Sequence, residues 1–339
     1  MKGRVSSAER FPDNGGVAIV IVLWVVLVLS LLISGFAFTM HVETQVASYA
    51  RKELKAEMLA RSGVEVARMQ LILGALSPTN SGFDALNQDW STNELLYVDH
   101  ELGDGIFNVK VTDEESKIPV NRVTDLQLKR LFGLLGVDAA DGDVITDSIL
   151  DWIDTDDLTR LNGAESDYYQ SLSPPYRAKN APLDRVEELL LIRGVTPELY
   201  QGTPATDTDP ARPGLAEVFT TMSSGSINVN TASAIVLQAL GLDEAQVQAV
   251  LSRRDGADGI PGTEDDLPFH SAEEFFAAIG NLDPATKLTA QALVTVNSSF
   301  FTVKSTGEVG GVKRTILATL FRNGAKIQTV MWREVREGT

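Results

Sequence analysis

Residues 15–40 read GGVAIVIVLWVVLVLSLLISGFAFTM, and no residue between Asn14 and Val42 carries a full charge at neutral pH. The apolar core of this stretch, Val17 to Thr39, is long enough to cross a bilayer whose hydrocarbon layer is about 30 Å thick. Secretory signal peptides have shorter apolar cores of roughly 7 to 15 residues and an Ala-x-Ala-like exit, which this run lacks. We therefore predict one transmembrane helix over residues 17–40.

The segment before this helix is short and polar. Residues 1–16 hold three basic residues, Lys2, Arg4 and Arg10, and two acidic ones. This weak positive bias favours a cytoplasmic N-terminus, because basic flanks stay on the cytoplasmic side of a membrane. We therefore expect everything after Met40 to face outward.

The chain after the membrane keeps a helical pattern. Apolar residues such as Val46, Tyr49 and Met58 recur among charged ones, and no proline appears before Pro78. One helix could thus run from near Val17 to near Leu76. At about 1.5 Å per residue it would be on the order of 90 Å long.

Strand patterns stand at both ends of the remaining sequence. The segments are Leu95–Val98, Ile106–Val111, Phe300–Ser305, Arg314–Phe321 and Lys326–Trp332, and the last three are separated by Gly310-Gly311 and Asn323-Gly324. Such glycine pairs and Asn-Gly are hairpin turns. Because helical patterns lie between the two groups of strands, we predict a small antiparallel sheet into which a helical domain is inserted.

The middle of the chain contains an internal repeat. Ile118–Val123 (IPVNRV) is echoed by Ile227–Ala232 (INVNTA), and each segment precedes a helix that ends in glycine, a second helix, an acidic loop and a short helix with its own glycine. We infer two copies of a small helix-hairpin-helix-like unit, over about residues 116–200 and 226–295.

Composition limits the classes of function. The chain has 46 acidic and 29 basic residues, a formal net charge of -17 and no cysteine, and its three histidines lie far apart. Excess negative charge opposes binding to phosphate backbones and favours hard cations or basic partners. Thiolate metal sites and disulfides are impossible, and a histidine-rich zinc site has no support. No nucleophile elbow, P-loop or dinucleotide fingerprint occurs, so we expect no enzyme.

The second acidic loop, Asp255–Asp266, packs five carboxylates and three glycines into twelve residues. Calcium takes six to eight oxygen ligands, and glycines let backbone carbonyls join the carboxylates. The spacing is not that of an EF-hand. We predict a calcium site with Asp255, Asp258, Glu264, Asp265 and Asp266 as ligands; the alternative is a solvated turn.

The first acidic loop is longer and lies in the first copy of the repeat. Its candidate ligands for a second calcium ion are Asp154, Asp156, Asp157 and Glu165. The alternative is an acidic, solvated face at the end of a helix, because carboxylates also decorate loops that bind nothing.

The beginning of the apolar stretch resembles a type IV prepilin processing site, with cleavage expected between Gly16 and Val17. Where that family normally has glutamate, five residues after the cut, this chain has Ile21. Lack of that glutamate and the pattern through Trp24 resemble the K-type minor pseudopilins of type II secretion systems. The Asn-x-Asn-Thr opening of the repeat and the acidic pattern from Asp151 onward are similar to that family too.

The resemblance implies an α+β pseudopilin fold, with a long N-terminal transmembrane helix packed on a small antiparallel sheet and a large inserted all-α domain of two helix-hairpin-helix/SAM-like repeats. The expected parts are a leader (1–16), the transmembrane helix (17–40), the pseudopilin helix and first strands (41–115), the inserted domain (116–295) and the C-terminal strands (296–339). It also implies calcium binding in the inserted domain.

The implied function is that of a non-enzymatic subunit at the tip of the secretion pseudopilus. Its implied partners are the I- and J-type minor pseudopilins, the major pseudopilin and a prepilin peptidase. The implied location is the inner membrane, crossed once, with the C-terminal domain in the periplasm.

A DNA-binding alternative stays open, because the Ile-Asn-Val-Asn-Thr-Ala opening also resembles membrane-anchored DNA-uptake receptors. DNA-binding hairpins use a Gly-hydrophobic-Gly turn whose N–H groups approach phosphate. Here the turns read Gly136-Val137-Asp138 and Gly241-Leu242-Asp243. A carboxylate in place of the second glycine opposes phosphate binding, so we expect no nucleic-acid partner.

Overall fold

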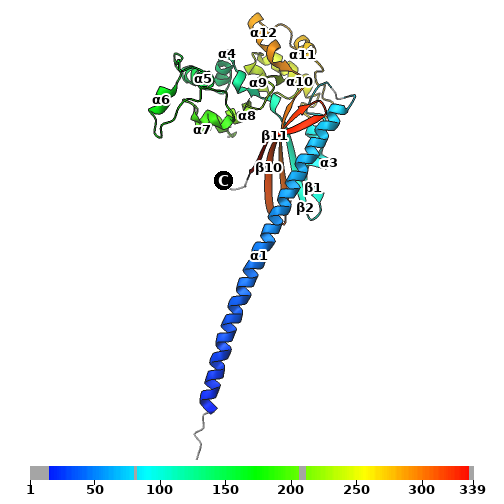
Figure 1. Cartoon of the computed structure of the whole chain (residues 1–339). Helices are drawn as coiled ribbons and strands as arrows, with labels where there is room; N and C mark the ends of the chain where they lie inside the picture. Colours follow the sequence, from blue (N-terminus) through cyan, green and yellow to red (C-terminus); the bar gives the residue numbers. More distant parts are fainter. Residues whose placement is uncertain (1–14, 80–81, 206–210, 336–339) are drawn as a thin grey trace, which may run out of the picture. The chain divides into compact units, whose positions relative to one another are not determined.

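The computed structural model of the chain describes residues 15–79, 82–205 and 211–335. It contains two compact units, residues 1–54 and residues 55–339. Helix α1 spans Gly15–Leu76, so the prediction of one long helix is confirmed (Figure 1). Most of the predicted leader, residues 1–14, lies outside the described residues.

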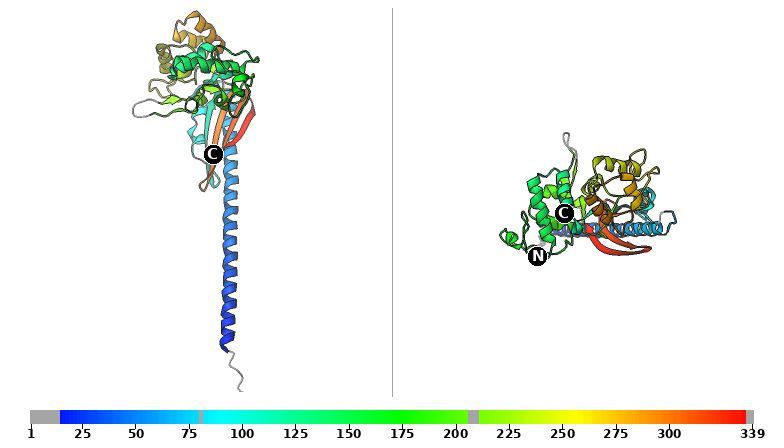
Figure 2. Two further views of the ribbon diagram at one scale, coloured as in Figure 1. Left: turned by 90° about the vertical axis from the view of Figure 1, so that its left-hand side faces the viewer. Right: turned by 90° about the horizontal axis from the view of Figure 1, so that it is seen from above.

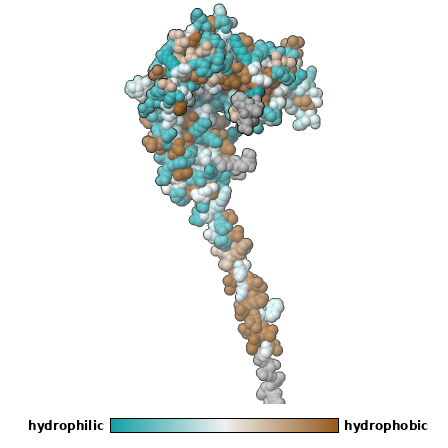
Figure 3. Space-filling model, turned by 180° about the vertical axis from the view of Figure 1, so that it is seen from behind, coloured by the Kyte–Doolittle hydropathy of each residue, from teal (hydrophilic) through white to brown (hydrophobic). Residues whose placement is uncertain are grey.

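Among the described residues, the first unit is the N-terminal part of α1, residues 15–54, and it contains the apolar stretch. The large side chains from Val17 to Phe38 are exposed, and an 18-residue stretch of this helix has a mean hydropathy of 3.2 with none of it buried. Figure 3 shows mainly hydrophobic side chains along the visible face of this part of the helix. Within the described residues it is the one helix long and apolar enough to cross a membrane. A helix that is apolar all round requires apolar surroundings, which fits a membrane anchor.

The second unit contains a five-stranded antiparallel sheet in the order β1-β2-β9-β10-β11. The strands are β1 (His100–Leu102), β2 (Gly105–Asp113), β9 (Phe300–Val309), β10 (Val312–Asn323) and β11 (Lys326–Val335). The predicted turns join β9 to β10 and β10 to β11, with positive φ at Gly310, Gly311 and Gly324. Four of the five predicted strands are thereby confirmed.

The C-terminal half of α1 packs on this sheet. Small residues on its buried face, Ala56, Ala60 and Ala67, have no exposed surface. A Cβ atom added to Gly63 of α1 would lie 2.8 Å from Cγ2 of Val109 on β2, and one added to Gly307 of β9 would lie 2.7 Å from the backbone nitrogen of Ala60. Helix and sheet therefore approach so closely that both positions need glycine.

The predicted strand over Leu95–Val98 is wrong. Residues Glu94–Tyr97 form a short helix, α3, after another, α2 (Asp89–Thr92). The Asn93 side chain caps α3 by accepting a hydrogen bond from the Leu96 backbone nitrogen at 3.2 Å. The cap outweighs the strand preference of the Leu-Leu-Tyr-Val run, because it directs Tyr97 into the core and leaves Leu95 88% exposed.

The chain between β2 and β9 is the insertion. Its helices are η1 (Glu114–Ser116), η2 (Val120–Arg122), α4 (Asp125–Leu134), α5 (Ala139–Ile153), α6 (Ser166–Gln170), η3 (Val186–Leu191), α7 (Pro197–Gln201), α8 (Leu215–Val218), α9 (Ala234–Ala239), α10 (Glu244–Arg254), α11 (Ala272–Ile279) and α12 (Pro284–Leu293). Figure 2 shows the helices of the first and second copies of the repeat as neighbouring groups.

The insertion is mainly helical, but it is not all-α, so that part of the prediction is wrong. Three ladders of two-residue strands stitch its loops together: β3 (Ile118–Pro119) with β6 (Phe219–Thr220), β4 (Gly202–Thr203) with β5 (Arg212–Pro213), and β7 (Ile227–Asn228) with β8 (Val294–Thr295). These pairs satisfy buried backbone groups where the chain enters and leaves each group of helices.

The insertion has an apolar core separate from that of helix and sheet. Phe132, Ile149, Leu237 and Phe275 lie in it, each at most 1% exposed. Within the second unit, the insertion and the helix-and-sheet part therefore each bury their own set of apolar side chains.

Candidate functional site

The first acidic loop begins at the C-terminal end of α5. Asp151 lies in the last turn of this helix with no exposed surface, and Asp154 is its C-cap residue. The backbone nitrogen of Arg160 donates to both oxygens of Asp151, at 3.3 and 3.2 Å, and the guanidinium group pairs with Asp151 at 3.3 Å and with Asp154 at 3.7 Å. One arginine thus serves two carboxylates.

Several oxygens in this loop are buried without a donor. Both carboxylate oxygens of Glu165, Oδ1 of Asp154 and Oδ1 of Asn180 have no hydrogen-bond partner among the described residues. An unsatisfied buried oxygen costs free energy, and more so when it belongs to a carboxylate. Carboxylate and amide oxygens are the ligands that calcium prefers, so these side chains fit a hard cation.

The electrostatics of the loop point the same way. Burial, reinforced by the charges of Asp151 and Asp154, raises the pKa of Glu165 to about 7. Burial also raises the pKa of Asp151 to about 6, although the hydrogen bond from Arg160 acts against it. The carbonyl end of α5 adds partial negative charge beside both aspartates. A cation bound here would relieve all of these repulsions.

The structure brings together only some of the predicted ligands. The charges of Asp154, Asp156 and Asp157 all act on Glu165. Asp156 and Asp157 have donors of their own, since Asp156 accepts from the Leu158 backbone nitrogen and Asp157 from the Asn180 amide, each at 2.9 Å. No three acidic or histidine side chains of residues 15–79, 82–205 and 211–335 converge as they stand on a single ion position. Binding would therefore require side-chain rotation at this loop.

The ligand set expected from the sequence left out three oxygen-bearing residues here, although Asp151 was part of the acidic pattern. Asp147 and Asp151 lie one turn apart on α5, a spacing that could have revealed them. Asp147 accepts from the backbone and side chain of Asn162 at 3.0 and 3.1 Å. Asn180, at a positive φ of 46°, had no signal in the pattern because it comes from a loop far along the chain.

Carboxylates of the second acidic loop accept hydrogen bonds from donors in the same loop. Asp265 accepts from the Ala257 backbone nitrogen and the Thr263 hydroxyl, both at 2.7 Å, and these donors lower its pKa. Asp266 accepts from the Gly262 backbone nitrogen at 2.7 Å, and Asp258 accepts from that of Ile260 at 2.8 Å. The loop's own donors thus do much of what a cation would do.

Its two remaining predicted ligands point elsewhere. Asp255 pairs with Arg254 at 2.7 Å, and Glu264 is exposed. The structure therefore brings together Asp258, Asp265 and Asp266, held by loop hydrogen bonds, and not the full predicted set. None of the buried oxygens that lack a partner among the described residues lies in this loop.

The two hairpin turns use their backbone N–H groups internally. The Val137 nitrogen donates to the Phe132 carbonyl at 2.9 Å, and the Leu242 nitrogen donates to the Leu237 carbonyl at 3.3 Å. Such 6→1 bonds close helix C-termini. In the second turn the Asp243 carboxylate accepts from the Gln246 backbone nitrogen at 2.8 Å. Neither the Val137 nor the Leu242 N–H group is free to donate a hydrogen bond to a phosphate.

Comparison with known proteins gives consistent matches. Residues 105–203 and residues 227–296 match the family described as type II secretion system (T2SS), protein K. Type II secretion system protein K of Aeromonas hydrophila is 25% identical over 354 residues, which cover 96% of this chain and 98% of that protein. The protein of the same name from Pectobacterium carotovorum is 28% identical over 262 residues, covering 72% of this chain and 73% of that protein.

A solved structure has the same fold. A chain of the GspK-GspI-GspJ complex from the type 2 secretion system of enterotoxigenic Escherichia coli superposes with a TM-score of 0.68 at 20% identity, covering 87% of this chain and 100% of that chain. The two family matches lie on either side of the middle of the insertion. They agree with the fold, which has an apolar helix, an antiparallel sheet and an acidic insertion. The chain belongs to the type II secretion system protein K family.

Proposed function

We propose that this minor pseudopilin of type II secretion occupies the tip of the pseudopilus, where it initiates assembly for the export of folded proteins. The observation that carries the proposal is α1, whose apolar first part is continuous with a helix packed on a five-stranded sheet, itself interrupted by a bulky insertion. This supports a structural role in which the helix is the assembly element and the insertion limits stacking above it.

Ile21 supports the terminal position. In subunits that have glutamate at this place, the carboxylate is thought by family analogy to neutralise the N-terminal amine of a neighbour. The exposed aliphatic side chain of Ile21 offers no charge. A subunit without the carboxylate therefore fits a place where no neighbour requires it.

The proposed location is the inner membrane, crossed once by α1, with the second unit in the periplasm. The proposed partners are the I- and J-type minor pseudopilins and the major pseudopilin; the solved relative is itself part of a GspK-GspI-GspJ complex. Extraction of the tagged chain with mild detergent is expected to recover both minor pseudopilins. Recovery of the chain alone under conditions that preserve other pseudopilin contacts would contradict the proposed partners.

Processing gives the sharpest test of this function. A prepilin peptidase is expected to cut between Gly16 and Val17, so intact-mass and N-terminal peptide analysis of the native protein should find a chain that begins at Val17. Gly16→Glu is the matched variant and should retain the leader. A native protein that keeps residues 1–16 would overturn the proposal.

We also propose that the first acidic loop binds calcium through Glu165, Asp154 and the Asn180 side chain. The support is the set of buried oxygens without donors and the raised pKa of Glu165. These residues would hold the ion at the ends of α5 and α6 and tie the loop to both helices. The ion itself would supply positive charge to a cluster of carboxylates and perform no reaction.

Calorimetric titration of the full chain in detergent with CaCl₂ tests this assignment. Glu165→Gln is expected to lower the affinity at least tenfold, while Asp258→Asn, in the second acidic loop, should change it less than threefold. If the Asp258 variant loses binding and the Glu165 variant keeps it, the site is the second loop. If neither variant changes the titration, both calcium predictions fail.

The two groups of helices are proposed to be copies of one helix-hairpin-helix-like unit. Asn121 donates to the Leu183 carbonyl at 2.9 Å and accepts from the Leu183 nitrogen at 2.8 Å. Asn230 makes the same pair of bonds with Phe269, also at 2.9 and 2.8 Å. Two asparagines at matching places in the repeat, with matching bonds, support a duplicated unit.

A further inference from the structure

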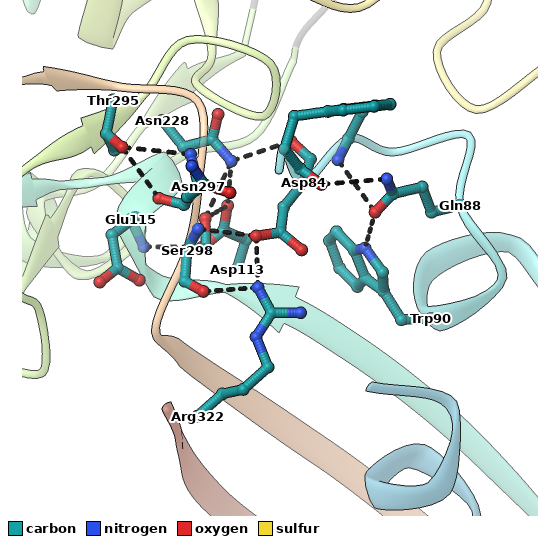
Figure 4. A network of polar contacts seen from close by, with 12 residues as sticks. Asp84, Gln88, Trp90, Asp113, Glu115, Asn228, Thr295, Asn297, Ser298 and Arg322 are labelled. Carbon is teal, nitrogen blue, oxygen red and sulfur yellow. Dashed lines mark hydrogen bonds and ion pairs between the residues drawn. The ribbon is translucent and has the colours of Figure 1, made fainter. Parts of the chain in front are cut away.

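The insertion is joined to the sheet by two chain crossings that lie side by side. The chain leaves the sheet at Asp113, the last residue of β2, and returns through Ser298 into β9. Since β2 and β9 are neighbours, with Asp113 opposite Phe301, both crossings pass through one narrow region. We call this region the neck and define it by Asp84, Asp113, Glu115, Asn228, Ser298 and Arg322 (Figure 4).

Asp113 is the hub of the neck. Its carboxylate accepts hydrogen bonds from the Thr231 hydroxyl at 2.5 Å, the Ser298 hydroxyl at 2.6 Å, the Asn228 amide at 3.1 Å and the Glu115 backbone nitrogen at 2.9 Å. These donors come from the outgoing crossing, the returning crossing, and β7 with the turn that follows it in the insertion. One side chain of the sheet thus fastens both crossings to the second copy of the repeat.

The other two carboxylates extend the network. Asp84 pairs with Arg322 of β10 and accepts from the Ser298 backbone nitrogen at 2.7 Å. Glu115 accepts from the Ser224 backbone nitrogen at 3.1 Å and from that of Phe300 at 3.0 Å. Each carboxylate therefore joins segments that are far apart in the sequence.

The charges in the neck do not balance. Asp84, Asp113 and Glu115 are each at most 2% exposed, and Arg322 pairs with one of them, Asp84. The other charged groups nearby already have partners: Glu114 pairs with Lys117 at 3.2 Å, and Arg254 of α10, which donates to carbonyls next to β7, pairs with Asp255. The segment of β7 and the turn after it contributes uncharged Asn228 and Thr231.

We propose that the neck is a proton-dependent joint, in which a proton held on Asp113 keeps the insertion fastened to the sheet and loss of that proton loosens both crossings. The structure contains a hydrogen-bond acceptor for a proton on Asp113. Thr231 can accept from a protonated Asp113 and turn its own hydrogen toward the Asn228 carbonyl, 3.4 Å away. A pocket of about 260 Å³, lined by Asp84, Ser298 and Arg322, brings solvent to the edge of the network.

The direction of the pH effect follows from burial. Burial, together with the charges of Glu115 and Asp84, raises the pKa of Asp113 to about 7, against hydrogen bonds from Ser298 and Thr231 that lower it. The closed neck thus holds its proton to higher pH than an open one, in which an aspartate loses it near pH 4. Closure is therefore most favourable at acidic pH and weakens as pH rises from about 4 to 7.

Hydrogen exchange of the full chain in detergent micelles tests the joint. After correction for intrinsic rates, protection of peptides from residues 224–232 and 296–300 is expected to fall by roughly 30-fold between pH 5.5 and 8, as the shift in pKa requires. Asp113→Asn mimics the protonated acid, because its amide can face the two hydroxyls. It should change less than about threefold over the same range.

The controls separate this joint from the acidic loops and from the secretory role. Glu165→Gln, measured with and without calcium, should keep the pH response of the neck, and peptides from the centre of β10 should not show it. If Asp113→Asn fails to fold, Glu115→Gln replaces it and should shift the loss of protection to lower pH, since one charge that raises the pKa of Asp113 is gone. A wild-type neck with equal protection at both pH values, or variants that respond like the wild type, would overturn the proposal.

Discussion

Glu165 makes the stability of the insertion depend on pH. Its pKa of about 7 lies above the ordinary 4.5, so the folded protein keeps a proton that the unfolded chain loses first. In EDTA the free energy of unfolding should therefore fall as pH rises from about 4.5 to 7, by roughly 3 kcal/mol from this residue. Glu165→Gln should remove that part of the slope in urea denaturation.

Calcium should reverse this dependence, because it binds the ionised carboxylate. With millimolar CaCl₂ the stabilisation of the wild type should grow toward pH 7, and Glu165→Gln should show little of it. Identical pH profiles for the two proteins in both buffers would show that Glu165 is neither a shifted acid nor a ligand.

The paired asparagines give a second prediction for single residues. Asn230→Ala and Asn121→Ala each leave a backbone N–H and a carbonyl without their partner, so each should lower the free energy of unfolding by about 2 kcal/mol. Exposed Asn281→Ala is the control and should stay within about 0.5 kcal/mol. A tolerated Asn230→Ala would argue against a shared clamp in the two copies of the repeat.

Residue types could be predicted from the sequence better than their partners. The acidic pattern pointed to Asp154 and Glu165, because carboxylates crowded in a short segment are visible in one dimension. Asn180 and Asp113 could not be found in this way. Their roles depend on groups that folding brings together: Asn180 comes from a separate loop, and Thr231, a donor to Asp113, lies 118 residues along the chain.

Among the elements, those with long regular patterns were predicted correctly. Strands β9 to β11 alternate apolar and polar residues between glycine turns, and α1 has no proline, so local chemistry and the fold agree. The run at Leu95–Val98 was too short for periodicity to decide, and a single asparagine cap turned it into α3. The two-residue strands of the insertion were too short for a strand pattern, since tertiary contacts create them.

The contact between α1 and the sheet gives the prediction for elements. Gly63→Ala would place a methyl group against Val109 and Ser305, so the helix and sheet must separate and the free energy of unfolding should fall by about 2 kcal/mol or more. Gly74→Ala on the same helix meets no atom within 4 Å and should stabilise by about 0.5 to 1 kcal/mol. If Gly63→Ala and Gly74→Ala changed the stability equally in thermal denaturation, the result would contradict a close approach of helix and sheet at Gly63.

At the scale of the whole molecule, the strands at both ends of the soluble sequence were enough to predict an insertion into a sheet. They were not enough to predict the neck, because its side chains come from the helix-to-sheet linker, both crossings, β7 and β10. A joint of this kind depends on which strands are neighbours. That order becomes known only when β2 is seen beside β9.

The net charge of -17 supports the last prediction, which concerns DNA. Duplex DNA should not be retarded by the full chain in a gel at 50 mM salt, because binding requires basic side chains that release phosphate counterions. Replacing both turn aspartates, Asp138→Gly with Asp243→Gly, restores the Gly-x-Gly sequence of DNA-binding hairpins but leaves the chain strongly acidic and its turn N–H groups occupied. This double variant should also fail to bind. Retardation by the wild type that disappears steeply with added salt would instead revive the DNA-uptake alternative, since only phosphate contacts give such a slope.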